Sequence, residues 1–322
     1  MNKTDFVINA LTLQKLKSND FIIQTKAIKE LDQKLEDLLA RGACGAIVVS
    51  RTRVGKTCGA IYVKNCFQEY YGKDFPVIMW DVTDHAVTQK NFYSTLLTAM
   101  GVPHKTNSTA LTLRERTLNE LVLRANNTIF HKVVIMIDEA WRFAENDFSW
   151  LMDLYNVLRR SDIQLTCFMF GTWELRELKE TFKRNGKNQI VERFMNNEYQ
   201  FFGIRESAEL GLCLFALDNV NTVNPEGEGE SLKEFYFPNA GRNDTFYSLM
   251  KDYWEAFQNI KTKYGVTAPD IPMEYVMESF KILLTSYGKL SASAVVFPSY
   301  HEIYDSILAT NYTESCDEYN PK

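Results

Sequence analysis

The sequence lacks any apolar run of the roughly 18 residues that a membrane-spanning helix needs, so we expect no membrane partner. Its first residues, Met1–Ala10, show no basic flank followed by an apolar core, which argues against a secretory signal. The six cysteines show no CxxC spacing, and this argues against both a zinc site and a disulfide framework. Together these absences predict a reduced protein of the cytoplasm.

The sequence also lacks an excess of basic residues. In 322 residues, 36 Lys and Arg stand against 41 Asp and Glu, for a formal net charge of −5. This balance argues against a protein that coats itself with nucleic acid over its whole surface. It leaves room for a local basic surface, because charges act over a Debye length of roughly 8–10 Å.

Residues 45–205 alternate short β-rich runs with longer amphipathic runs, a pattern typical of a parallel sheet wrapped by helices. Four of the candidate strands are near-continuous apolar runs, as expected for strands buried on both faces. The candidate strands are Ala46–Ser50, Pro76–Asp81, Lys132–Asp138, Leu165–Gly171 and Tyr199–Ile204. The candidate helices between them are Lys56–Tyr70, Gln89–Met100, Leu111–Asn126 and Phe148–Arg160, with Asn107-Ser108-Thr109 as a cap for the third.

Outside this region the strand signal disappears and helical spacing of apolar residues remains. The candidate helices there are Thr25–Leu39, Glu206–Val220, Thr245–Tyr264 and Met273–Tyr287. We therefore expect four parts: an N-terminal extension and helix over residues 1–40, a nucleotide-binding α/β domain over 41–205, a helical lid domain over 206–309, and a flexible acidic tail over 310–322.

A phosphate-binding motif is predicted where the first strand ends. Residues 50–57 read Ser-Arg-Thr-Arg-Val-Gly-Lys-Thr and lie between an apolar run and a helix. In a P-loop, backbone N–H groups surround the phosphates, the lysine neutralises their charge, and the following hydroxyl ligates Mg²⁺. Lys56 and Thr57 fit these roles, whereas Ser50 replaces the usual first glycine. The predicted nucleotide-binding residues here are Ser50, Arg51, Thr52, Arg53, Val54, Gly55, Lys56, Thr57 and Cys58.

An acidic pair follows the apolar run Val133–Ile137. A buried strand would deliver Asp138 to the edge of the sheet beside the P-loop, where it can hold Mg²⁺ together with Thr57. Glu139 would then orient and activate the attacking water. The two motifs in this order predict binding of ATP with Mg²⁺.

Four further residues are candidates from their positions alone. Thr172 ends a strand and could sense the γ-phosphate, although an ordinary strand-ending threonine fits equally well. Arg193 precedes the last strand, where an arginine could reach the γ-phosphate of a neighbouring subunit, with Arg184 as the substitute. Arg242 could fold back onto the nucleotide, or it could simply belong to a capping turn.

The combination of these motifs resembles the TnsC/TniB family, AAA+ regulators of DNA transposition that include those of CRISPR-associated transposons. The resemblance extends over roughly residues 20–260 and includes Asp138-Glu139-Ala140, the segment Phe170-Gly171-Thr172-Trp173-Glu174-Leu175 and the segment Ile190-Val191-Glu192-Arg193-Phe194. It implies an AAA+ fold, with a five-stranded parallel sheet sandwiched by helices and a helical lid. Ser50 is the clearest departure from the family pattern.

The resemblance further implies assembly on duplex DNA as a homo-oligomeric ring or filament with ATP bound. Such an assembly links a target-site selector to the transposase, and hydrolysis takes it apart. Loops facing a central channel would contact phosphates without reading sequence. Those loops would be Thr83–Lys90, Pro103–Thr109 and Trp141–Asn146, with Lys90, Lys105, Thr106 and Arg142 as the DNA-binding candidates.

Three other functions remain open from the residues. A replication initiator or helicase loader shares most of these motifs, although an initiator usually adds a DNA-binding domain for which residues 265–322 look short and irregular. A P-loop kinase rarely needs the Asp-Glu pair. A nucleotide-gated signalling module without a DNA partner would suit the net acidity.

Overall fold

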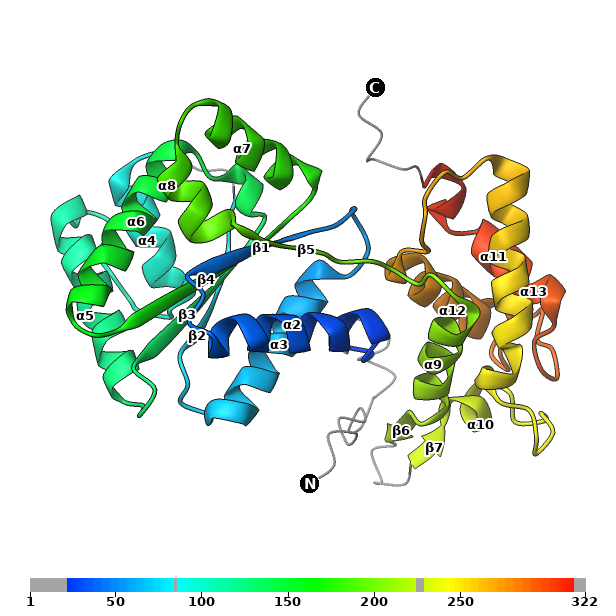
Figure 1. Cartoon of the computed structure of the whole chain (residues 1–322). Helices are drawn as coiled ribbons and strands as arrows, with labels where there is room; N and C mark the ends of the chain where they lie inside the picture. Colours follow the sequence, from blue (N-terminus) through cyan, green and yellow to red (C-terminus); the bar gives the residue numbers. More distant parts are fainter. Residues whose placement is uncertain (1–21, 84–85, 224–228, 316–322) are drawn as a thin grey trace. The chain divides into compact units, whose positions relative to one another are not determined.

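The computed structural model describes residues 22–83, 86–223 and 229–315, and its helices and strands are drawn in Figure 1. These residues form two compact units. The sheet unit comprises Glu30–Ser50 and Lys56–Phe201, and the helical unit comprises the other described residues, namely 22–29, 51–55 and those from 202 onward. The loop Arg51–Gly55 therefore belongs by its contacts to the helical unit.

The sheet unit is built on a five-stranded sheet in the order β2-β3-β4-β1-β5, and every neighbouring pair of strands is parallel. The strands are β1 (Gly45–Val49), β2 (Val77–Asp81), β3 (Lys132–Asp138), β4 (Gln164–Gly171) and β5 (Asn197–Gln200). All five residues of β1 are buried, which explains why its sequence has no polar alternation. The predicted α/β fold with a five-stranded parallel sheet is confirmed.

Helices cover both faces of this sheet (Figure 1). They are α2 (Lys26–Ala40), which the boundary of the units crosses, α3 (Lys56–Tyr71), α4 (Gln89–Ala99), α5 (Ala110–Asn126), α6 (Glu145–Arg160), α7 (Trp173–Arg184) and α8 (Asn188–Ile190), with the short η1 (Ala140–Arg142) and η2 (Val191–Met195). On one face Ile135 packs in a core with α4, α5 and α6. On the other, Phe67 of α3 meets Phe168 of β4 with ring centroids 6.2 Å apart. Successive residues of a strand therefore pack against helices on opposite faces of the sheet.

The helical unit has a hydrophobic core of its own. Its helices are α9 (Ser207–Asp218), α10 (Leu232–Tyr236), η3 (Phe246–Leu249), α11 (Met250–Tyr264), α12 (Met273–Tyr287), α13 (Tyr300–Leu308) and η4 (Asn311–Glu314). Leu214, Phe257, Phe280 and Ile303, from four of these helices, are fully buried together. The short antiparallel strands β6 (Asn221–Val223) and β7 (Gly229–Ser231) correct the expectation that no strand follows residue 205.

Several segments differ from their predicted bounds. The last strand of the sheet ends at Gln200 instead of Ile204, and Ile204 forms an isolated antiparallel bridge with Ile271 in the helical unit. In the segment expected to be a flexible tail, η4 is ordered and Tyr312 is fully buried. The rest of that tail, residues 316–322, and most of the N-terminal extension, residues 1–21, lie outside the described residues. Within the described ranges, no helix combines the length and apolar character that a membrane span requires.

Candidate functional site

The phosphate-binding motif occupies the connection from β1 to α3. Ser50 is buried, and its N–H donates to the carbonyl of Gly171 at 3.2 Å, which continues the pairing of β1 with β4. The turn that follows has two residues with positive φ, Arg53 at 63° and Gly55 at 103°. No atom would obstruct a Cβ at Gly55, so its backbone conformation, and not a lack of space, favours glycine there. A turn of this kind before a helix start directs backbone N–H groups toward an anion.

The first turn of α3 meets the end of β3. The Thr57 hydroxyl donates to Oδ2 of Asp138 at 2.6 Å. Asp138 and the first residue of the helix, Lys56, are 6% and 7% exposed, whereas Thr57 and its neighbour Cys58 are exposed. The two predicted motifs therefore converge.

A hydroxyl and a carboxylate in contact fit the requirements of Mg²⁺ in nucleotide sites. This ion takes oxygen ligands, and it usually keeps several waters and phosphate oxygens besides one or two protein groups. Thr57 and Asp138 would hold it here. A larger cluster is not needed, and the described residues contain no group of three His, Cys, Asp or Glu side chains arranged to hold a metal.

The strand order places β4 between the strands that carry the two motifs. Val49 of β1 pairs with Gly171, and Ile137 of β3 pairs with Met169, so Thr172 follows the tip of the central strand. Its side chain is 8% exposed, and its hydroxyl donates to the carboxylate of Glu174. Thr172 thus lies at the sheet edge expected from the sequence, already engaged with an acidic partner.

Glu139 begins a short turn in a left-handed conformation, with φ of 53°. Its N–H donates to Oδ1 of Asp138 at 3.0 Å, and its own Oε2 accepts a hydrogen bond from Nε1 of Trp141 at 2.5 Å. The guanidinium of Arg142 lies over the indole ring, 4.8 Å from its centroid. Trp141 therefore fixes the direction of the Glu139 carboxylate. Trp141 has no sequence signal for this role apart from its proximity to the acidic pair.

A third carboxylate lies at the same sheet edge. Asp81 ends β2 and is paired in register with Asp138, and it is exposed. The sequence indicates the position of Asp81 by the same pattern that indicates Asp138, namely an apolar strand that ends in an acidic residue. Asp81 was not among the predicted site residues.

Three arginines are predicted to act on the nucleotide, Arg193 and Arg184 in the sheet unit and Arg242 in the helical unit. Arg193, on η2, donates to Oδ1 of Asn156 at 2.9 Å and lies over the ring of Tyr155 at 4.5 Å, so it lies along α6. Arg184 is exposed at the end of α7 and donates to the Thr181 hydroxyl at 3.3 Å. Arg242 is exposed in the turn before η3. Within the sheet unit, the contacts of Arg193 are therefore with α6 and that of Arg184 is within α7.

The four predicted DNA-binding residues lie on three connections of the sheet unit. Lys90 is exposed in the first turn of α4, and Lys105 and Thr106 are exposed in the turn between α4 and α5. Arg142 is half-buried on η1 and stacks on Trp141. Three of the four side chains are thus open to a partner, and Arg142 presents a cation backed by an aromatic ring.

In the helical unit, the phosphate-binding loop faces a pocket of about 400 Å³. Its lining includes Arg51–Arg53, Pro272 and Tyr275, together with residues of η4 and after it. The loop residues therefore have neighbours at the start of α12 and at the end of the described chain. Neither segment carries a motif that would predict this proximity from the sequence.

Comparison with known proteins agrees with this geometry. Residues 39–178 match a protein-family model described as an AAA domain. No curated protein is significantly similar in sequence. The matched range contains both motifs and the strands β1 to β4.

Solved structures share the fold over most of the chain. The ORC1 protein of Aeropyrum pernix, in complex with DNA, has a TM-score of 0.52 and 12% identity, over 95% of this chain and 68% of that one. CDC6P from Pyrobaculum aerophilum has a TM-score of 0.56 and 8% identity, over 86% and 66% of the two chains. Domain III of the Thermotoga maritima replication initiation protein DnaA has a TM-score of 0.50 and 12% identity, over 93% and 98%.

The chain spans about two thirds of the length of the two archaeal proteins. At identities of 8% to 12% these likenesses show the fold alone. The chain has the α/β fold of the AAA+ P-loop ATPases, and residues 39–178 match an AAA domain.

Proposed function

We propose that this chain is an AAA+ ATPase that binds ATP with Mg²⁺ at residues 50–57 and hydrolyses it with Glu139. The observation that carries the proposal is the 2.6 Å hydrogen bond from Thr57 to Asp138, beside the buried Lys56. It joins the two groups that an ATPase of this fold uses for the metal. If residues 50–57 were an ordinary surface turn and β3 an unrelated strand, this contact between Thr57 and Asp138 would not be expected.

Each residue has a distinct task in this proposal. The Lys56 ammonium and the N–H groups of the loop bind the phosphates, while Thr57 and Asp138 hold the metal. The chemistry supplied by a bound Mg²⁺ is neutralisation of charge on the β- and γ-phosphates. The Glu139 carboxylate accepts the proton of the attacking water through one oxygen, while Trp141 donates to the other.

Experiment can test this ATPase proposal directly. Wild-type protein should bind a fluorescent ATP analogue in the presence of Mg²⁺ and release phosphate from ATP. Cys58, which is exposed in the first turn of α3, offers a second readout, because bound nucleotide should slow its alkylation. A chain that neither binds the analogue nor protects Cys58 would contradict the proposal.

We further propose that ATP serves as an assembly switch on duplex DNA, in a cytoplasmic regulator of transposition with transposase subunits and a target selector as partners. The support is the resemblance of the motifs to the TnsC/TniB family, together with exposed Lys90, Lys105 and Thr106 and the Arg142–Trp141 pair. In an assembly, Arg193 or Arg184 of one subunit would act on the nucleotide of its neighbour. Arg242 and Thr172 would respond to the nucleotide within the chain.

The second candidate function is a replication initiator or helicase loader, which would use the same switch. One observation supports this candidate: the solved structures that share the fold include an ORC1 protein in complex with DNA and domain III of a replication initiation protein. The resemblance of the motifs to the TnsC/TniB family supports the transposition regulator.

DNA binding measured with ATP, a non-hydrolysable analogue, ADP or no nucleotide separates these functions. A transposition regulator should form large oligomers on any duplex, only with a triphosphate, and with affinity that falls steeply with salt. Preference for one duplex sequence would favour an initiator. Absence of DNA binding with every nucleotide would leave a signalling ATPase or a kinase.

A further inference from the structure

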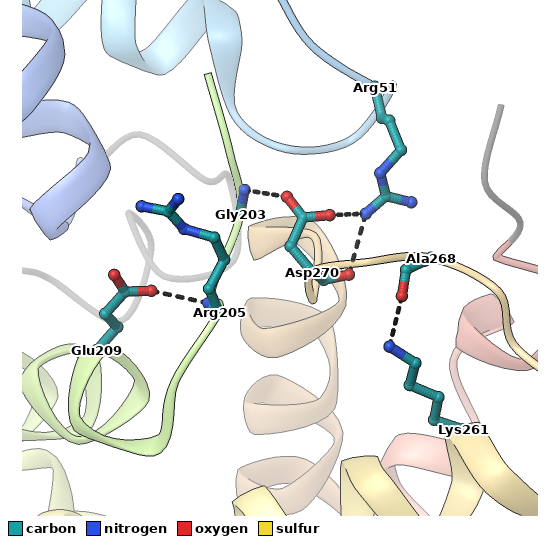
Figure 2. Close-up of polar contacts among 7 residues, drawn as sticks. All are labelled: Arg51, Gly203, Arg205, Glu209, Lys261, Ala268 and Asp270. Atoms are coloured by element: carbon teal, nitrogen blue, oxygen red, sulfur yellow. Dashed lines mark hydrogen bonds and ion pairs between the residues drawn. The ribbon is translucent and has the colours of Figure 1, made fainter. Parts of the chain in front are cut away.

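Arg51, the second residue of the phosphate-binding motif, directs its side chain toward Asp270 (Figure 2). Its Nη2 donates both to the carboxylate of Asp270 and to the carbonyl oxygen of the same residue, the latter at 3.0 Å. Arg51 is 5% exposed and Asp270 is 4% exposed. Two opposite charges are therefore buried against each other, with one of them inside the loop that binds phosphate.

Asp270 also holds a second segment of the chain. Its Oδ2 accepts a hydrogen bond from the N–H of Gly203 at 2.5 Å (Figure 2). The next residues, Ile204 and Ile271, exchange two backbone hydrogen bonds of 2.8 Å each. A Cβ at Gly203 would collide with the carbonyl of Ile271, so the two backbones approach as closely as only glycine permits. One carboxylate thus fixes both the loop and the segment that follows β5.

A second contact joins the same loop to the start of α12. The carbonyl of Arg53 accepts a hydrogen bond from the N–H of Glu274 at 3.2 Å, and the Arg53 guanidinium pairs with the Glu274 carboxylate, also at 3.2 Å. The first N–H groups of a helix have no acceptor within the helix, so this carbonyl satisfies one of them. The ion pair is half-exposed on both sides and contributes little by itself. The backbone contact nevertheless depends on the conformation of Arg53, whose φ is positive.

These contacts give the phosphate-binding loop two sets of constraints. Its ends continue β1 and α3, while Arg51 and Arg53 are held by residues 270–274. Phosphate can bind only when the N–H groups of the loop take one particular arrangement. If the contacts with residues 270–274 stabilise that arrangement of the loop, the affinity for nucleotide rises. If they stabilise a different arrangement, the affinity falls. By linkage, nucleotide must then change the stability of the contacts at Asp270 by the same factor.

We propose that Arg51 and Asp270 are positioning residues that couple nucleotide binding in the loop to the backbone pairing of Gly203–Ile204 with Asp270–Ile271. Neither side chain touches the nucleotide, and Arg51 is an anchor of the loop instead of a phosphate ligand. The proposal rests on ATP binding by residues 50–57. It gives the ATPase a route by which a partner bound to the helical unit sets the affinity for nucleotide.

Hydrogen exchange of three amides tests the coupling in the full chain. Gly203, Ile204 and Ile271 each donate one of the hydrogen bonds described above. A non-hydrolysable ATP analogue with Mg²⁺ should slow their exchange by about 5- to 150-fold, the usual range for coupled sites. If the analogue binds and these amides exchange at an unchanged rate, the coupling does not exist. If the analogue does not bind at all, the ATPase proposal is wrong, and the proposed coupling, which rests on it, is wrong as well.

Variants distinguish a positioning role from a merely structural one. Asp270→Asn keeps the shape of the side chain and one acceptor oxygen but removes the negative charge that faces Arg51, so nucleotide affinity should fall by about 5- to 150-fold. The double variant Arg51→Met with Asp270→Asn removes both charges and should fold with near wild-type stability. It should still bind the analogue more weakly, and the analogue should no longer slow exchange at Ile204 and Ile271.

A matched control breaks an exposed ion pair in the sheet unit. Lys183 and Glu180 lie 2.7 Å apart with about half of each side chain exposed, so Lys183→Met should leave nucleotide affinity and the exchange response unchanged. The positioning role is overturned if the double variant recovers both the wild-type affinity and the slowed exchange. That result would show that the buried pair serves folding alone.

Discussion

The sheet unit and the helical unit each contain a short polar contact, and the two contacts differ in exposure and charge. In the sheet unit an exposed neutral hydroxyl, Thr57, donates to Asp138. In the helical unit, the charged groups of Arg51 and Asp270 are both buried. The first contact can be exchanged for metal and water at small cost, because Thr57 is neutral and exposed. The second cannot open without exposing a buried charge or leaving it unpaired, which costs several kcal/mol.

This difference assigns different tasks to the two contacts. Groups that bind and release a ligand in each cycle must exchange partners easily, and the exposed hydroxyl does so. A contact that transmits a conformational preference must persist while the ligand comes and goes, and the buried pair meets that requirement. We therefore expect variants at the sheet edge to change chemistry, and variants at Asp270 to change coupling.

The largest effect should follow from Lys56→Ala. Lys56 is 7% exposed at the start of α3, and its loss removes the cation that neutralises the phosphates. Affinity for a fluorescent ATP analogue should fall about 100-fold or more, equivalent to roughly 3 kcal/mol. Lys64→Ala, two turns further along the same helix, is the matched control and should bind normally. Normal nucleotide binding by the Lys56 variant would place the phosphates elsewhere.

A large effect on turnover alone is expected for Glu139→Gln. The amide keeps the shape and the acceptor for Trp141 but cannot take a proton from water. Phosphate release should slow about 10²- to 10⁴-fold, while affinity for ATP stays within about twofold. The variant should accumulate in the ATP-bound, assembled form, detectable by light scattering on duplex DNA. If it loses ATP binding instead, Glu139 is not the residue that orients the water.

An intermediate effect is expected for Trp141→Phe, which keeps an aromatic ring under Arg142 but removes the N–H that reaches Glu139. A hydrogen bond to a charged group contributes about 1.5–3 kcal/mol, so kcat should fall by about tenfold or more with KM nearly unchanged. Trp150→Phe, on α6, is the control for loss of an indole and should turn over normally. An increase in kcat would show that Trp141 restrains Glu139 instead of aligning it.

The contact between Thr57 and Asp138 could be predicted from the sequence because the elements that carry these residues follow local rules. Near-continuous apolar runs predicted β1, β3 and β4, and the residues that end these strands met at one edge as the topology requires. The side chain of Thr109 caps α5 as its position predicted. Helix α13 was missed, although Ser299 and Glu302 form a capping box at its start that the sequence displays.

The contacts at Asp270 could not be predicted in the same way. Arg51 and Asp270 are 219 positions apart, and an isolated aspartate in a loop carries no periodicity or motif. The role of Asp270 depends on the position of Gly203 and Ile204 beside residues 270–271. This proximity arises only in the folded chain. The same holds for Trp141, whose bond to Glu139 requires the left-handed turn at that residue.

The smallest expected effect concerns Tyr312, which lies in η4 close to the same buried pair. Its hydroxyl is buried without a hydrogen-bond partner among the described residues, and burial raises its pKa to about 12. An unfolded tyrosine ionises near pH 10, so above that pH the unfolded chain binds fewer protons and stability falls as pH rises toward 12. Tyr312→Phe should lessen this loss by at most about 1.4 kcal/mol per pH unit and leave stability at pH 7 unchanged or higher. Denaturant unfolding at pH 8 and pH 11 measures both, and a variant less stable at both pH values would show that the hydroxyl has a partner.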